Sequence, residues 1–144
     1  MKISIGADHR GFNLKEDIIE QFKEIDWLDV GTFDTTRTHY PIYAKRVCEH
    51  VLNKNVDVGI VICGSGVGAS IAANRYEKIY ASLCWNEGVA RAAKEHDGAN
   101  VLVLPADFVG AHEAFAICRA WFDTTFKGGV YQDRLDMIDR CGDE

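Results

Sequence analysis

Cys63 ends an apolar run and is followed by a loop with three glycines, Gly64, Gly66 and Gly68, and then by a segment of helical character. The thiol is therefore predicted to lie where a strand gives way to a helix, and this is where ligands bind in open α/β sheets. Glycines let backbone N–H groups approach an anionic ligand closely, and a helix N-terminus adds a positive potential that favours an oxyanion and a thiolate. The combination predicts proton abstraction or covalent catalysis by Cys63.

Two other interpretations compete for this motif. A cysteine at the end of a buried strand is often only a small core residue. A Gly-x-Gly-x-Gly loop also suits a nucleotide phosphate, but the Lys-Ser/Thr of a P-loop is missing, and the glycine spacing differs from that of a dinucleotide fold. The motif alone leaves these alternatives open.

Further polar groups lie beside other predicted strand ends. Asp8, His9 and Arg10 follow the first strand, Tyr40 opens a helix, and His96 lies in a polar segment before the last strand. Such groups at a strand's carboxyl end favour ligand binding, whereas helix capping by Asp8 and a surface turn around His96 are the structural alternatives. The His, Cys and carboxylate positions show no strong metal-ligand spacing and no zinc signature.

Strand-like runs alternate with helical segments, which predicts an α/β fold with a five-stranded parallel sheet covered on both faces. After Gly128 and Gly129 the chain resumes as a short C-terminal helical extension. This extension has little core of its own to bury against, which favours packing on a partner subunit. The five predicted strands are Lys2–Ala7, Trp27–Val30, Val58–Cys63, Ile79–Cys84 and Asn100–Leu104.

Length and composition narrow the class of protein. The 144 residues, 47% of them apolar, suffice for one core, so residues 1–144 are expected to form a single domain. A net charge of −6 with scattered basic residues argues against a nucleic-acid partner. No apolar run approaches membrane-spanning length and the N-terminus resembles a strand, so we expect no membrane association. Five cysteines without Cys-x-x-Cys favour a reduced, cytoplasmic protein.

Five motifs occur in order along the chain: Gly6–Lys15, Tyr40-Pro41, Ile62–Arg75, His96–Leu102 and Phe126–Gly129. Together they resemble the family of type B ribose-5-phosphate isomerases and galactose-6-phosphate isomerases. The resemblance implies a Rossmann-like αβα sandwich and aldose–ketose isomerisation of a sugar phosphate without metal or cofactor. It also implies a homodimer or homotetramer whose active sites are shared between subunits. Ribose 5-phosphate and ribulose 5-phosphate are the default substrate pair.

The same resemblance implies roles for individual residues. Cys63 is the base that moves a proton between C1 and C2 through a cis-enediolate, with its pKa lowered from about 8.5 by the helix N-terminus. His96, reaching the site from the neighbouring subunit, is the acid or base of sugar-ring opening. The hydroxyl of Ser65 and the backbone N–H groups of Gly64, Gly66, Val67 and Gly68 hold the oxyanion. The other implied substrate-binding residues are Asp8, His9, Arg10, Tyr40, Asp97, Asn100 and Arg134, with Arg134 on the phosphate.

Some positions depart from the family pattern. Val130 replaces the arginine of a Gly-Gly-Arg-His tail, Asp107 stands where a second arginine is common, and Asp97 replaces an asparagine. The stretch from Gly31 to Tyr43 resembles the B subunit of galactose-6-phosphate isomerase. The alternatives are therefore such a B-type subunit, an isomerase of another aldose, including an unphosphorylated one, and a non-catalytic sugar-phosphate-binding protein.

Overall fold

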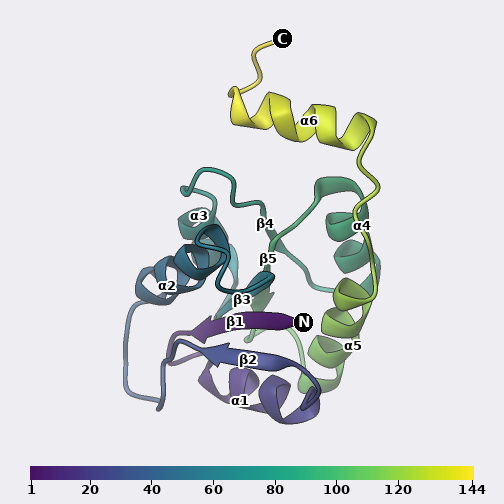
Figure 1. The fold of residues 1–144 in the computed structure, drawn as a ribbon. Helices are drawn as coiled ribbons and strands as arrows, with labels where there is room; N and C mark the ends of the chain where they lie inside the picture. The colour runs from purple at the N-terminus through teal and green to yellow at the C-terminus, as the bar shows by residue number, and fades with distance from the viewer.

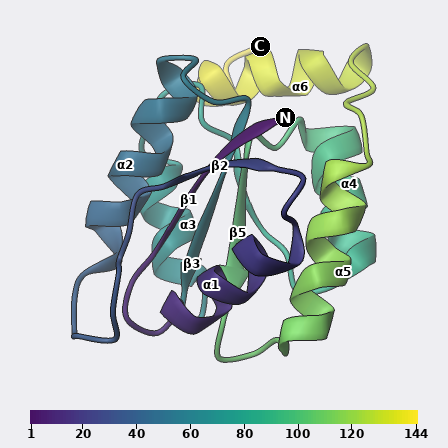
Figure 2. The same ribbon diagram turned by 60° about the horizontal axis from the view of Figure 1, so that its bottom comes forward.

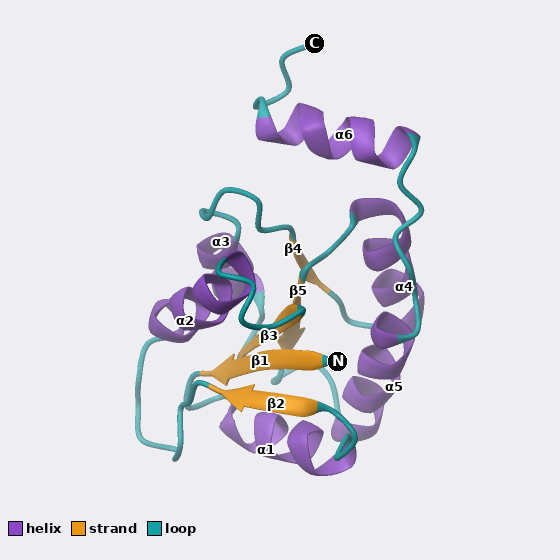
Figure 3. Ribbon diagram, viewed as in Figure 1, coloured by secondary structure: helices purple, strands orange, loops and turns teal.

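Five strands form one sheet in which every strand is parallel to its neighbours (Figures 1 and 3), and the computed structural model describes all residues 1–144. The strand order is β2-β1-β3-β5-β4. This confirms the predicted fold class. The strands are β1 (Lys2–Ala7), β2 (Asp26–Asp29), β3 (Val58–Cys63), β4 (Ala81–Leu83) and β5 (Val101–Pro105). β4 is shorter than predicted, because the backbone N–H of Tyr80 donates to the Asn100 side chain before the strand begins.

Six helices accompany the sheet. Helices α1, α4 and α5 cover one face, and α2 and α3 cover the other. Figure 2 shows α2 and α3 on the left of the sheet, α4 and α5 on the right, and α6 across the end of the molecule where β1 starts. None of the six is both long and apolar enough to span a membrane. Their bounds are α1 (Phe12–Gln21), α2 (Tyr40–Leu52), α3 (Val67–Ala73), α4 (Glu87–Asp97), α5 (Ala111–Phe122) and α6 (Val130–Asp139).

The central strand β3 is buried on both faces, which explains why it is apolar without alternation. Ile60 and Ile62 pack toward α1 and α5, whereas Val61 and Cys63 pack toward α2 and α3. Burial on both sides fixes the position of Cys63 at the strand's end.

A buried lysine ties α1 to the end of β2. The side chain of Lys15 is fully buried, and its Nζ lies 2.7 Å from carboxylate oxygens of both Glu16 and Asp29. The other carboxylate oxygen of Asp29 accepts a hydrogen bond from the N–H of Gly31 at 2.9 Å. These bonds fix the start of the loop that leads to α2 and its first residue, Tyr40.

Helix α6 makes only a thin contact with the rest of the chain. Leu135 is its one buried residue and lies over Gly98, whereas Val130 and Ile138 are 55% and 61% exposed. At its far end Asp139 pairs with Lys78 and accepts a hydrogen bond from the Tyr80 hydroxyl. The helix is thus held mainly by polar contacts, and most of its apolar side chains remain uncovered within the chain.

Candidate active site

The carboxyl ends of parallel strands meet at one edge of the sheet, and a cavity of about 360 Å³ opens there. Cys63 is paired with Pro105 of β5, and Ala7 of β1 is paired with Ile62, so the cavity lies beside the point where the strand order reverses. Cys63 is 4% exposed and borders the cavity. The lining residues are Asp8, Arg10, Tyr40, Cys63, Gly64, Ser65, Gly68, Asp107 and Phe108.

The loop after Cys63 adopts the conformation that its glycines predict. Gly66, directly before α3, has φ +75°. Residues with a side chain rarely adopt this left-handed backbone conformation. A Cβ at Gly68 would lie 2.5 Å from the Tyr40 ring, so the missing side chain lets Tyr40 lie directly on the loop. The Ser65 hydroxyl accepts a hydrogen bond from the N–H of Val67 at 3.2 Å, and its own proton stays available for a ligand.

The environment of Cys63 differs from the one we expected. Burial raises the pKa of the thiol, and the negative charge of Asp8 adds to the rise, while the backbone N–H groups of Ala69, Gly66 and Ser65 act against it. The expected fall in the thiol pKa is therefore wrong for this chain. The physical reason is that desolvation of the thiol outweighs the few N–H groups at the start of the seven-residue helix α3.

Asp8 has a structural role and also faces the cavity. One carboxylate oxygen accepts hydrogen bonds from the backbone N–H groups of Arg10, at 3.0 Å, and Gly11, at 3.2 Å. These bonds close the turn between β1 and α1 but do not cap the helix, because α1 begins at Phe12 with Gly11 as its N-cap and no side-chain cap hydrogen bond. The same side chain, 5% exposed, lines the cavity beside Cys63, so Asp8 both holds the turn and borders the candidate site.

His9 and Arg10 differ in how they meet the cavity. The backbone N–H of Thr38 donates to Nδ1 of His9 at 3.2 Å, so in the neutral ring the proton is assigned to Nε2. Arg10 lines the cavity, where its guanidinium pairs with Asp107 next to Gly64. Sequence reasoning noted Asp107 only as a departure from the family pattern and missed Phe108 as a lining residue. Their place directly after β5, at the same sheet edge, is the signal that could have found them.

The remaining predicted site residues lie at the opposite edge of the sheet. His96 and Asp97 are in the last turn of α4, Asn100 directly precedes β5, and Arg134 is on α6. The Asn100 side chain accepts from the N–H of Tyr80 and donates to the carbonyl of Lys78, both at 2.8 Å. Asp97 borders a separate cavity of about 270 Å³ between β4 and α6. One chain therefore does not bring His96 and Arg134 to Cys63.

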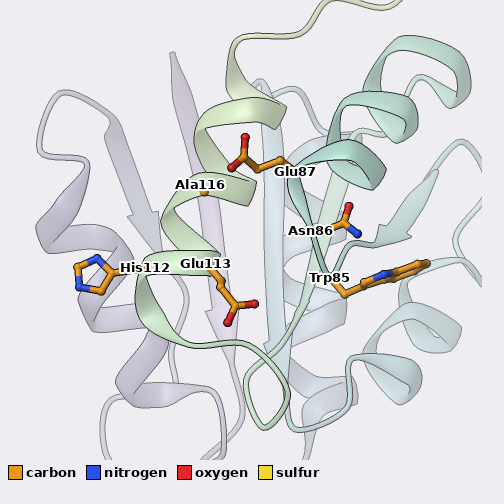
Figure 4. A pocket seen from close by; sticks show the side chains of 6 residues that line it. All are labelled: Trp85, Asn86, Glu87, His112, Glu113 and Ala116. Carbon is orange, nitrogen blue, oxygen red and sulfur yellow. The ribbon is translucent and has the colours of Figure 1, made fainter.

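A third cavity, of about 340 Å³, lies at the starts of α4 and α5 (Figure 4). Trp85 and His112 point away from each other there, so the side chains do not converge on one ligand position. Two of the polar side chains are already bonded within α4. The Asn86 side chain accepts a hydrogen bond from the N–H of Val89, and Glu87 forms an ion pair with Arg91. The Cys63 cavity is therefore the better candidate active site. No cluster of three or more His, Cys, Asp or Glu side chains suited to a metal ion occurs in the chain.

A thiol beside a cavity at the switch point of a parallel sheet, with a loop of backbone N–H groups next to it, is an arrangement suited to binding a small, anionic substrate. Comparison with known proteins gives the family. Residues 3–138 match the model of the family described as Ribose/Galactose Isomerase, and the chain belongs to that family. It is accordingly an aldose–ketose isomerase.

Individual relatives cover nearly the whole chain. Ribose-5-phosphate isomerase B of Escherichia coli is 40% identical over 139 residues, which span 95% of this chain and 93% of the relative. The crystal structure of a ribose 5-phosphate isomerase from Thermotoga maritima superimposes with a TM-score of 0.95 at 43% identity and covers 96% of this chain and 97% of its own. Ribose-5-phosphate isomerase B of Mycoplasma genitalium, solved with bound ribulose-5-phosphate, gives a TM-score of 0.90 at 38% identity. The match covers 97% of this chain and 95% of that relative.

Proposed function

We propose that this enzyme interconverts ribose 5-phosphate and ribulose 5-phosphate, with Cys63 as the base. The observation that carries the proposal is the position of the Cys63 thiol at the cavity wall beside the glycine loop. The names of the relatives in Escherichia coli and Thermotoga maritima, and the ribulose-5-phosphate bound to the Mycoplasma genitalium enzyme, support this substrate pair.

In the proposed reaction the Cys63 thiolate takes the proton from C2 of the open-chain aldose. The electron pair of the C2–H bond forms the C1–C2 double bond, and the C1 carbonyl electrons move onto O1 to give a cis-enediolate. Transfer of the O2 hydroxyl proton to O1, and return of the proton from Cys63 to C1, completes the ketose. Backbone N–H groups between Gly64 and Gly68, with the Ser65 hydroxyl, stabilise the oxyanion because this charge exists only along the reaction path.

The proposal includes a homodimer with shared active sites. His96 is in the last turn of α4 and Arg134 is on α6, which crosses the end of the molecule where β1 starts (Figure 2), whereas Cys63 is the last residue of β3. One chain therefore holds two halves of the proposed site that cannot meet. A second copy related by a twofold axis can bring its His96 to the first copy's Cys63 cavity, and the same operation completes the other site. His96 then opens the sugar ring as a general acid or base.

The charges around the cavity support an assignment of the group that binds the phosphate. Asp8 and Asp107 place two carboxylates there against the single guanidinium of Arg10, which is already paired with Asp107. Arg134 makes no ion pair with any carboxylate of its own chain and is free to bind a dianion. We therefore assign the phosphate to Arg134 of the second copy and the sugar hydroxyls to the Cys63 cavity.

Replacing Arg134 with alanine should raise the KM for ribose 5-phosphate by about 10- to 100-fold, the range expected from losing a charge-assisted hydrogen bond. Initial rates on ribose 5-phosphate, galactose 6-phosphate and free ribose measure this and identify the substrate. Arg140→Ala, at the end of the same helix, is the matched control and should leave KM unchanged. A preference for galactose 6-phosphate or for free ribose would refute the substrate assignment, and equal KM values in both variants would refute the role of Arg134.

The pH dependence of the free enzyme should report the ionisation of Cys63. Because the base must be a thiolate and its pKa is raised, kcat/KM should increase with pH through a midpoint above the ordinary thiol value of about 8.5. Asp8→Asn removes the negative charge that contributes to this rise, while the asparagine oxygen can still accept from Arg10 and Gly11. The midpoint should therefore move to lower pH.

The control for this experiment is Asp17→Asn, which removes a carboxylate from the exposed face of α1. It should leave the midpoint of the kcat/KM profile in place. If Asp8→Asn also leaves the midpoint where it is, or moves it upward, then the titrating group is not the Cys63 thiol.

A further inference from the structure

One aromatic ring touches both of the groups that the proposed function assigns to the sheet edge opposite Cys63. The ring of Tyr131, in the first turn of α6, stacks on the imidazole of His96 with centroids 4.7 Å apart and planes 23° from parallel. The guanidinium of Arg134, three residues farther along the helix, lies 5.5 Å from the centre of the same ring. Stacked aromatic pairs and cations over an aromatic face are both attractive arrangements.

No hydrogen bond within the chain fixes the orientation of the His96 ring. The nearest carboxylate oxygen belongs to Glu95 and lies 3.9 Å from Nε2, which is beyond hydrogen-bond distance. That same oxygen is 2.6 Å from Nζ of Lys127, and this pairing lowers the pKa of Glu95. The face of Tyr131 is therefore the contact that defines the plane of the imidazole.

The segment before α6 is built to deliver Tyr131 to this position. The N–H of Lys127 donates to the carbonyl of Glu95 at 3.0 Å, which joins the segment to the last turn of α4. Gly128 and Gly129 follow with φ +66° and +57°, values that glycine adopts readily, and turn the chain into the helix. The N–H of Tyr131 then donates to the carbonyl of Gly128 at 3.1 Å. Backbone bonds thus hold the ring in place without involving its hydroxyl.

We propose that Tyr131 is a positioning residue that uses its ring to orient both His96 for sugar-ring opening and Arg134 for phosphate binding. The inference rests on the proposed function of these two residues. The ring is the working part, because the Tyr131 hydroxyl makes no hydrogen bond within the chain. Tyr131→Phe should therefore behave as the wild type, whereas Tyr131→Ala and Tyr131→Leu should both be impaired.

The first test is kinetic. Tyr131→Ala should lower kcat and raise KM for ribose 5-phosphate, each by about 2- to 10-fold, the range that single aromatic contacts give. In an Arg134→Ala background the same substitution should no longer raise KM, because the guanidinium that the ring orients is gone. Gln132→Ala, which removes only an exposed bond to Asp136 on the same helix, is the control and should match the wild type.

The second test observes the stack without relying on activity. Proton NMR of the five histidines, with the His96 signals assigned through His96→Asn, should show the His96 ring protons shifted upfield by the Tyr131 ring current. The shift should persist in Tyr131→Phe and vanish in Tyr131→Leu, which keeps apolar bulk if the alanine variant folds poorly.

The outcomes separate the two claims. The role of Tyr131 would be overturned if the His96 ring-proton shifts of Tyr131→Leu equal those of the wild type. It would also be overturned if the wild type is active and Tyr131→Ala has the same kcat and KM. A KM increase from Tyr131→Ala that persists in the Arg134→Ala background would overturn the link to Arg134. A wild-type protein without isomerase activity would refute the proposed function and with it the catalytic role of Tyr131, while the NMR shifts would still show whether the stack forms.

Discussion

Replacing Cys63 with alanine is expected to lower kcat for isomerisation by about 10²- to 10⁴-fold, the contribution that a positioned general base makes. KM should change little, because the thiol acts on a proton in the transition state and adds little to ground-state binding. The fold should survive, since alanine occupies less space than cysteine beside an existing cavity. Rates of ribose 5-phosphate turnover and a thermal unfolding curve measure the two effects.

Proton exchange makes the test of Cys63 specific. In deuterated water the wild-type enzyme should exchange the C2 proton of its substrate, and Cys63→Ala should not. Cys141→Ala, which removes the one exposed thiol of the chain, is the matched control and should keep both turnover and exchange. If Cys63→Ala retains near-normal exchange, another group is the base and the cysteine is only a core residue.

Mixing two inactive variants should restore activity if the active site is shared between subunits. Cys63→Ala and His96→Asn each damage a different half of the site, so a hybrid dimer has one site with both defects and one site that is intact. Random pairing makes about half of the dimers hybrid, and about a quarter of wild-type activity should return. Activity is measured before and after subunit exchange by partial denaturation and refolding.

Subunit exchange must be shown independently, by native mass spectrometry of one tagged and one untagged variant. The control mixture combines Cys63→Ala with the double variant Cys63→Ala, His96→Asn, in which no pairing yields an intact site. If hybrids form and activity stays at the level of this control, Cys63 and His96 do not act in a site shared by two subunits.

Much of the fold could be predicted, because buried parallel strands carry a strong local signal. The run from Val58 to Cys63 is apolar at nearly every position since both faces of β3 are covered, and its end is marked by glycines. Because the carboxyl ends of parallel strands meet at one edge, Asp8 and the glycine loop are expected to lie close together, and both line one cavity. Tyr40, which the family resemblance indicated, lines the same cavity. His96 precedes the last predicted strand and Asn100 begins it, and the structure finds both residues at the opposite edge of the sheet.

The parts that could not be predicted depend on contacts between distant segments. The raised pKa of Cys63 follows from the depth of its burial and from Asp8, and neither is encoded in the local motif. The pairing of Arg10 with Asp107 joins residues almost a hundred positions apart, and the stack of Tyr131 on His96 depends on the turn at Gly128 and Gly129. Local sequence patterns carry no signal for such pairs.

The thin attachment of α6 affects how this enzyme can evolve. Because Leu135 is the only residue of the helix that is buried within the chain, substitutions at exposed positions such as Val130 should cost the fold of the single chain little stability, typically within about 0.5 kcal/mol. The Cys63 end, by contrast, is embedded in the sheet and tolerates few changes. Substitutions on the exposed face of the tail therefore disturb the fold of the chain less than substitutions at the Cys63 end of the sheet, so the tail is the part in which sequence changes accumulate more easily.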